Sequence, residues 1–211
     1  MKPTHILLTR HGQTVTNREG RFCGHSETAL TPLGVEQARA LGRRLAGTRI
    51  DAVYTSDYSR AIDTAAIILE GRRLTPSFDP DLRELCYGEW EQRRERDVAR
   101  TGAWREEFAR MRAEDPAWRP PGGETIHEVR ARTMAALDRI GAAQTGRTVL
   151  VVTHGTAINC MLAAVLGMAP EFTFRISVAN CGLNRLLNSR GRYTVLSLND
   201  TAHLVGIESP A

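Results

Sequence analysis

Cysteine is scarce in this chain, and its four copies lie far apart. Cys23, Cys86, Cys160 and Cys181 form no Cys-x-x-Cys pair. Structural zinc sites and disulfide frameworks depend on closely spaced or regularly paired cysteines, so both are disfavoured. We therefore expect no metal site in this protein.

Long apolar runs and a strong net charge are also missing. No run reaches the length of a membrane span, and the N-terminus lacks the charged and then apolar segments of a secretion signal. The net charge is +4, Lys2 is the sole lysine, and the arginines are scattered rather than gathered in a stripe with aromatic residues. These absences predict a cytoplasmic protein that binds neither a membrane nor nucleic acid.

The overall composition is that of an ordinary globular protein. The chain has 211 residues, of which 42% are hydrophobic and 25% are charged. This length fits one sizeable domain with a full core, so we expect a single domain over residues 1–211.

A charged stretch from about 91 to 122 differs in character from the rest of the chain. Its composition predicts helices, and prolines and glycines at 120–123 end it, so we expect a helical lid inserted beside a pocket. Its sparse apolar residues either contact a ligand or form a small core of the lid, and we expect the core. They include Trp104, Phe108, Met111 and Trp118.

Short apolar runs alternate with amphipathic segments along most of the chain. Thr31 followed by Pro32 predicts the start of a helix, because threonine caps helices and proline fits their first turn. The alternation predicts an α/β fold with three α/β/α layers and a mostly parallel central sheet. The expected strands are 6–8, 51–55, 149–153, 183–187 and 193–198; the expected helices are about 32–47, 59–70, 125–143 and 156–166; and 12–28 is expected to be a loop.

Two of the predicted strands each deliver a histidine followed by a glycine. Arg10-His11-Gly12 follows the first apolar run, and His154-Gly155 follows the run 149–153. Ligands of parallel sheets gather at the carboxyl ends of the strands, so both imidazoles are expected at one pocket. Imidazole attacks phosphorus when its other nitrogen is held, and guanidinium groups neutralise phosphate oxygens. The alternative is that both histidines are structural.

Arg60 is a further candidate, near the start of the helix expected over 59–70. The helix dipole disfavours a basic residue at that end, so an arginine there indicates an anionic partner. The alternatives are a solvent-exposed side chain and an ion pair with Asp57.

Glu84 is the candidate proton donor. It lies between Leu82 and Leu85, which predicts a partly buried carboxyl group able to protonate a departing alkoxide. Glu89 and Glu91 are rival carboxylates, and a surface position for Glu84 is the alternative.

Several segments together form a recognisable series of motifs along the chain. They are Leu8-Thr9-Arg10-His11-Gly12-Gln13-Thr14, Asn17, Gly20-Arg21, Gly24, Leu30-Thr31-Pro32-Leu33-Gly34, Tyr54-Thr55-Ser56-Asp57, Arg60-Ala61, Leu82-Arg83-Glu84, Gly88-Glu89-Trp90-Glu91, Pro121-Gly122-Gly123-Glu124-Thr125, Thr153-His154-Gly155 and Leu198-Asn199-Asp200. In this order and spacing the chain resembles the histidine phosphatase superfamily, in its phosphoglycerate-mutase-like branch.

The resemblance implies a phosphoryl-transfer enzyme that needs neither a metal nor a cofactor. His11 would carry the phosphoryl group transiently, and Glu84 would protonate the leaving group and then deprotonate the attacking water. The implied catalytic residues are His11, Glu84, His154, Arg10 and Arg60, and the implied substrate-binding residues are Arg10, Asn17, Cys23, Gly24, Arg60 and Gly155.

Three positions depart from the usual pattern of the family. Cys23 stands where many relatives carry glutamine, which removes one donor near the phosphate. Gln92 stands where relatives usually have glycine, so the turn into the lid is expected to differ. Gln13 replaces a common glutamate. None of the three belongs to the implied catalytic set.

The length and the segment Gly88-Glu89-Trp90-Glu91 resemble the phosphatase members of this family. They predict a metal-independent hydrolase of a small-molecule phosphomonoester. The alternative enzyme is a phosphoglycerate mutase dependent on 2,3-bisphosphoglycerate. The alternative outside enzymes is a phosphate-binding protein with a dead site. A second copy of the chain is a possible partner, in a homodimer that would form through the apolar C-terminal strands.

Overall fold

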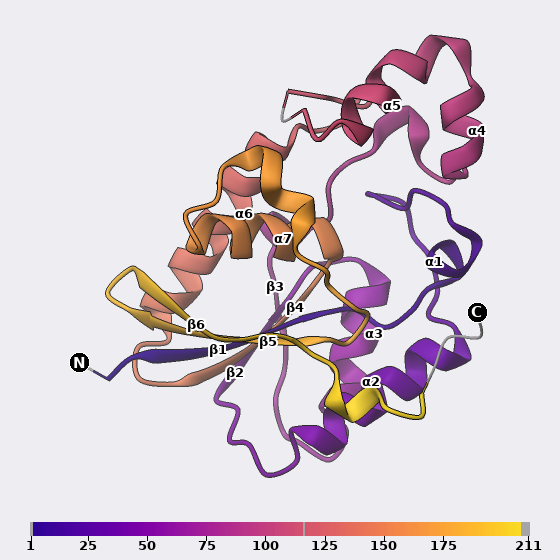
Figure 1. Cartoon of the computed structure of the whole chain (residues 1–211). Helices are drawn as coiled ribbons and strands as arrows, with labels where there is room; N and C mark the ends of the chain where they lie inside the picture. The colour runs from indigo at the N-terminus through magenta and orange to yellow at the C-terminus, as the bar shows by residue number, and fades with distance from the viewer. Residues whose placement is uncertain (1, 116, 208–211) are drawn as a thin grey trace.

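The computed structural model describes residues 2–115 and 117–207, which build a six-stranded sheet (Figure 1). Across the sheet the order is β3-β2-β4-β1-β5-β6. Neighbours from β3 to β1 pair in parallel, whereas β5 is antiparallel to β1 and to β6, so the predicted mostly parallel sheet is confirmed. The strands are β1 (Thr4–Arg10), β2 (Ala52–Thr55), β3 (Ser77–Phe78), β4 (Thr148–Thr153), β5 (Leu183–Ser189) and β6 (Arg192–Asp200).

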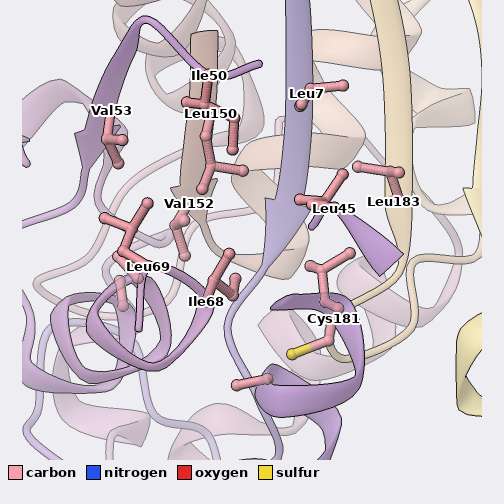
Figure 2. Packing of buried hydrophobic residues seen from close by; sticks show 14 residues of the cluster. Leu7, Leu45, Ile50, Val53, Ile68, Leu69, Leu150, Val152, Cys181 and Leu183 are labelled. Carbon is pink, nitrogen blue, oxygen red and sulfur yellow. The ribbon is translucent and has the colours of Figure 1, made fainter. Parts of the chain in front are cut away.

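Helices cover both faces of this sheet, which confirms the predicted α/β/α layers (Figure 1). On one face lie α2 (Pro32–Arg44) and α3 (Ser59–Ile68), and on the other lie α6 (Ile126–Ala143) and α7 (Gly155–Val165). Alternate side chains of β1 enter different cores, because successive residues of a strand point to opposite faces. Leu7 shares a cluster with Leu150 and Ile68 (Figure 2), whereas Ile6 and Leu8 belong to the cluster of α6 and α7.

The starts of the long helices follow from their capping residues. Thr31 Oγ1 accepts a hydrogen bond from the amide of Gly34 at 3.1 Å, and Pro32 occupies the first position of α2, as predicted. Thr125 and Glu128 form a capping box at the start of α6. The ends were predicted less well, since α2 stops at Arg44 rather than near 47.

Between β3 and α6 along the chain, the charged stretch forms short helices. It contains α4 (Glu95–Arg100), η3 (Gly102–Trp104) and α5 (Arg105–Arg112), which project from one end of the molecule (Figure 1). The core expected within the lid is instead shared with α6 and α7, which contribute Ile126, Val129 and Cys160. In this shared core the rings of Trp90 and Trp118 stack at 6.0 Å between centroids. Trp104, Phe108 and Met111 pack against this core.

Two elements were missed by the sequence analysis. The expected loop 12–28 contains a short helix, α1 (Val15–Glu19), because Thr14 and Asn17 form a capping box at its start. Five residues are too few to show a helical period. The two-residue strand β3 was also missed.

The remaining 3-10 turns are η1 (Pro80–Leu82), η2 (Gly88–Trp90), η4 (Pro170–Arg175) and η5 (Ala202–Leu204). Among the helices of the described ranges, none is long and apolar enough to cross a membrane.

Candidate active site

Three neighbouring strands end at the same edge of the sheet and bring the candidate residues together. Arg10 is the last residue of β1, Ser56 follows β2, and His154 follows β4 as the N-cap of α7. The rings of His11 and His154 lie 5.2 Å apart between centroids, in an edge-on arrangement. The predicted convergence of the two imidazoles is therefore present in the structure.

His11 is held in the orientation that a nucleophile needs. Its backbone amide donates to the carbonyl of Thr153 at 2.9 Å, and its Nδ1 lies 2.7 Å from the carbonyl oxygen of Gly12. A carbonyl oxygen only accepts hydrogen bonds, so Nδ1 carries the proton and Nε2 keeps its lone pair. Burial, together with the positive charges of Arg10 and Arg60, holds the pKa of His11 well below its ordinary value. The imidazole is therefore neutral at neutral pH.

Gly12 explains why the chain can turn so tightly after His11. A Cβ atom at this position would overlap the carbonyl oxygen of Gly34 in the first turn of α2. Only glycine allows the helix to approach this closely, so the Gly12 carbonyl can stay beside the imidazole.

Arg10 is partly buried, and desolvation lowers the pKa of its guanidinium. One terminal nitrogen donates to the carbonyl of Val178 at 3.0 Å, whereas Nε is buried and has no hydrogen-bond partner in the described part of the chain. The guanidinium lies against Gly155, where a Cβ would approach its carbon to 3.4 Å. An unpaired buried donor of this kind is costly unless a ligand satisfies it, so the Nε–H of Arg10 indicates an anion site.

Arg60 joins the second histidine to the loop above it. Its Nε donates to Nδ1 of His154 at 3.2 Å, and its terminal nitrogens donate to the carbonyls of Ser26 and Gly24 at 2.9 and 2.7 Å. His154 Nε2 must then carry the proton and donate to Ser56 Oγ at 2.8 Å. Burial and the charge of Arg60 hold the pKa of His154 well below its ordinary value. The alternative partner Asp57 pairs instead with Arg83.

The loop that Arg60 holds has its own support. Gly24 adopts a φ of 52°, and a Cβ there would overlap Oε1 of Glu91. Glu91 accepts hydrogen bonds from the amide of His25 at 2.8 Å and from Ser26 Oγ at 2.5 Å. Glu91, one of the two rival carboxylates, therefore holds the loop at His25 and Ser26 in place.

Cys23 and Asn17 lie at the same loop but offer different donors. Burial raises the pKa of the Cys23 thiol, and its Sγ donates to the carbonyl of Ser26 at 3.3 Å. Asn17 Oδ1 accepts from the amide of Thr14 at 3.2 Å and from Nδ2 of Asn180 at 3.4 Å. The amide group of Asn17 is therefore oriented with its oxygen inward, and its NH₂ is the group left for a ligand.

Glu84 is half-buried, as predicted. Its Oε1 accepts hydrogen bonds from the amides of Leu85 at 2.9 Å and of Thr156 at 3.1 Å, and Oε2 lies 3.2 Å from the same Thr156 amide. Thr156 is in the first turn of α7, so the helix N-terminus holds the carboxylate in place.

These residues line a cavity of about 310 Å³. Of the predicted site residues, the cavity wall includes Arg10, His11, Asn17, Cys23, Gly24, Arg60, Glu84 and Gly155. His154 is fully buried and is not part of this wall; the hydrogen bond from Arg60 Nε connects it to a residue that is. Within residues 2–115 and 117–207, no group of three or more His, Cys, Asp or Glu residues is arranged to hold a metal ion.

The sequence analysis missed the apolar side of the cavity. Phe22, Tyr87 and Phe174 line it, and the same three side chains line a second cavity of about 390 Å³ beside Met111. The only local sequence signal for this aromatic side is that Phe22 is next to Cys23. The other wall residues that were missed are Arg21, Thr156, Asn159 and Val178.

The fold brings His11 and two arginines, Arg10 from the end of β1 and Arg60 from the first turn of α3, to the wall of one cavity. A family model of the histidine phosphatase superfamily (branch 1) matches residues 6–201, so the chain belongs to that superfamily. Membership of this superfamily, together with the relatives below, indicates that the protein is an enzyme of the phosphatase or mutase type.

The similar proteins include both of these types. A Yersinia enterocolitica protein named "Probable phosphoglycerate mutase GpmB" is 34% identical over 205 residues, which cover 94% of each chain. The structure of YhfR from Bacillus stearothermophilus is 30% identical, with a TM-score of 0.91 over 97% of this chain and 100% of that one. The α-ribazole phosphatase of Shigella flexneri is 28% identical, with a TM-score of 0.85 over 93% of this chain and 96% of that one.

Proposed function

We propose that this protein hydrolyses phosphomonoesters through a phosphohistidine on His11, without a metal ion. The observation that carries the proposal is the 2.7 Å contact of His11 Nδ1 with the Gly12 carbonyl, which leaves Nε2 as the free nitrogen in a cavity that two arginines also line. Neutral imidazole is a competent nucleophile, and catalysis of phosphoryl transfer depends mainly on positioning and on positive charge around the three equatorial oxygens.

The first step transfers the phosphoryl group from the substrate to the enzyme. His11 Nε2 forms a bond to phosphorus while the bond from phosphorus to the ester oxygen breaks, and protonated Glu84 gives its proton to the departing oxygen. The unpaired Nε–H of Arg10 and the Arg60 guanidinium bind the phosphoryl oxygens.

The second step returns His11 to its starting state. Ionised Glu84 takes a proton from a water molecule, whose oxygen forms the new bond to phosphorus as the bond to Nε2 breaks. Inorganic phosphate leaves, and Glu84 is again protonated. The amides of Leu85 and Thr156 hold the carboxyl group of Glu84 in place through both steps.

The aromatic side chains of the cavity support an ester whose alcohol carries an aromatic ring. Of the arginines in the wall, Arg21 is already paired with Glu19 at 2.6 Å, which leaves Arg10 and Arg60 for one phosphoryl group. Beyond them, Phe22, Tyr87 and Phe174 form an aromatic side of the wall, and these three rings continue into the second cavity. The second cavity is also lined by Glu95, Arg112 and Glu114. Among the described residues of this wall, no second cluster of unpaired cations is left for the other phosphate of a bisphosphate.

A phosphoglycerate mutase is the second candidate, because a relative with 34% identity carries that name. A mutase must keep the phosphoryl group from water and return it to a bound intermediate. The two activities differ in whether inorganic phosphate accumulates.

The test compares purified protein with p-nitrophenyl phosphate and with 3-phosphoglycerate, each with and without 2,3-bisphosphoglycerate. We expect phosphate release from the first substrate without any bisphosphate. The variant His11→Ala is expected to abolish it, whereas His127→Ala, which changes an exposed histidine of α6, serves as the matched control. Isomerisation of 3-phosphoglycerate without matching phosphate release would establish the mutase instead.

A further inference from the structure

Glu84 lies in a segment that has no helix or strand to hold it. It follows η1, and three nearby carbonyl groups lie outside the strands of the sheet, those of Asp81, Arg83 and Glu84. All three accept hydrogen bonds from the guanidinium of Arg132 in α6, at 3.0, 2.7 and 2.8 Å. One side chain, 48 positions away in the sequence from Glu84, therefore binds three carbonyl groups of the backbone that carries the candidate proton donor.

The remaining donors of Arg132 are used on Glu124. Nε donates to Oε1 at 2.9 Å, and a terminal nitrogen donates to Oε2 at 2.8 Å. An arginine has five N–H donors, and the structure assigns one hydrogen bond to each. A lysine at this position would have only three donors on one nitrogen, so it cannot reproduce the arrangement.

Glu124 extends this support to the far side of Glu84. Its Oε2 also accepts from the amide of Cys86 at 2.9 Å, and its own amide donates to the carbonyl of Cys86 at 3.0 Å. Burial would raise the pKa of Glu124, but the hydrogen bonds from Arg132 and Cys86 outweigh burial and hold the pKa below its ordinary value. The ion pair therefore persists at neutral and mildly acidic pH.

The pair is also connected to the loop that Arg60 holds. His25 Nε2 lies 2.9 Å from the carbonyl oxygen of Glu84 and 3.8 Å from Oε2 of Glu124. The side chain of Arg132 is only 16% exposed, and that of Glu124 is 22% exposed, so bulk water does not replace these contacts. Neither residue lines the cavity.

We propose that Arg132, held by Glu124, is the positioning residue that places the Glu84 carboxyl group for proton transfer to the leaving oxygen. The proposal rests on the proposed function, in which Glu84 is the general acid. A displacement of about 1 Å at a catalytic group can cost on the order of a hundredfold in rate, so loss of the five hydrogen bonds is expected to be visible in catalysis.

The experiment uses leaving groups that need different amounts of protonation. Substrates are p-nitrophenyl phosphate, phenyl phosphate and benzyl phosphate, which share one aromatic ring. The readout is the ratio of kcat/KM for benzyl to p-nitrophenyl phosphate. Arg132→Met is expected to lower this ratio on the order of tenfold. The ratio for Arg132→Lys is expected to lie between the ratios for Arg132→Met and the wild type.

Arg139→Met is the matched control. Arg139 lies on the same helix and binds the same segment, but it is 53% exposed and contacts the carboxylates of Asp79 and Asp81 rather than the carbonyls beside Glu84. The ratio is expected to stay unchanged in this variant. Glu124→Gln keeps the shape of the partner and is expected to lower the ratio less than Arg132→Met, so the proposal stays testable if the methionine variant does not fold.

A double variant separates this proposal from the proposed function. If Arg132 acts through Glu84, adding Arg132→Met to Glu84→Gln leaves the ratio of Glu84→Gln unchanged. Equal losses for all three substrates in Arg132→Met and Glu124→Gln would overturn the positioning role. A Glu84→Gln variant with an unchanged ratio would instead overturn the acid role of Glu84, and the positioning proposal with it.

Discussion

The two buried histidines make the stability of the folded protein depend on pH in a defined window. His11 and His154 both have pKa values held well below the ordinary value, first by burial and then by neighbouring arginines. The unfolded chain protonates its histidines near pH 6.5, whereas the folded protein keeps these two neutral. Their contribution to stability is therefore complete above pH 6.5 and is lost as the pH falls below it.

The magnitude follows from the titration of the unfolded chain. Between pH 6.5 and pH 5.5, each histidine that stays neutral in the folded state lowers the free energy of unfolding by about 1 kcal/mol. The two together account for about 2 kcal/mol. Carboxylates contribute little in this window, because they are ionised in both states until the pH falls toward 4. His203 also has a lowered pKa, so it must be present in every variant compared.

The assay is urea unfolding at both pH values, followed by tryptophan fluorescence. The double variant His11→Gln, His154→Gln is expected to lose about 2 kcal/mol less than the wild type between pH 6.5 and 5.5, and each single variant about 1 kcal/mol less. The buffer contains no phosphate, because an oxyanion that binds the folded state would stabilise it. A wild type and a double variant that lose the same free energy would refute the neutral, buried state of these histidines.

Three further predictions concern the site directly. Glu84→Gln is expected to lower kcat/KM for benzyl phosphate by on the order of a hundredfold or more, and for p-nitrophenyl phosphate much less, because nitrophenolate leaves without a proton; equal losses in steady-state assays would remove the acid role. Gly24→Ala is expected to raise KM and to lower the free energy of unfolding by about 1 kcal/mol or more, because φ is 52° and the new Cβ meets Glu91. The control is Gly47→Ala, because a Cβ at that position has no atom within 4 Å. Phe174→Ala is expected to raise KM for aryl phosphates more than for glycerol phosphate, measured by phosphate release, because the ring walls both cavities; an equal rise for both would place the alcohol elsewhere.

Much of the fold was predictable because its signals are local. Ile6 to Leu8 and 149–153 are apolar runs that end at a histidine and a glycine, and parallel strands place such ends together. Thr31 and Pro32 mark a helix start by their own chemistry. The short helix α1 gave no such signal, since its capping box is compatible with several turns.

The site was predictable in its residue types more than in its contacts. The sequence offered three carboxylates near the Trp90 segment, and only the tertiary structure shows that Glu84 reaches the start of α7 while Glu91 supports the loop at Gly24. Phe174 enters the cavity from a 3-10 turn far along the chain. Arg132 was indistinguishable from other arginines of an amphipathic helix, because its role depends on carbonyl groups about 50 positions away.

The covalent state of His11 during turnover tests the central claim most directly. Wild-type protein would be mixed with p-nitrophenyl phosphate, quenched within one turnover under alkaline conditions that preserve phosphohistidine, and digested for mass spectrometry. We expect one phosphoryl group on the peptide that contains His11, and none on that peptide in His11→Ala. A phosphoryl group on a different residue, or undiminished hydrolysis by His11→Ala, would contradict the account.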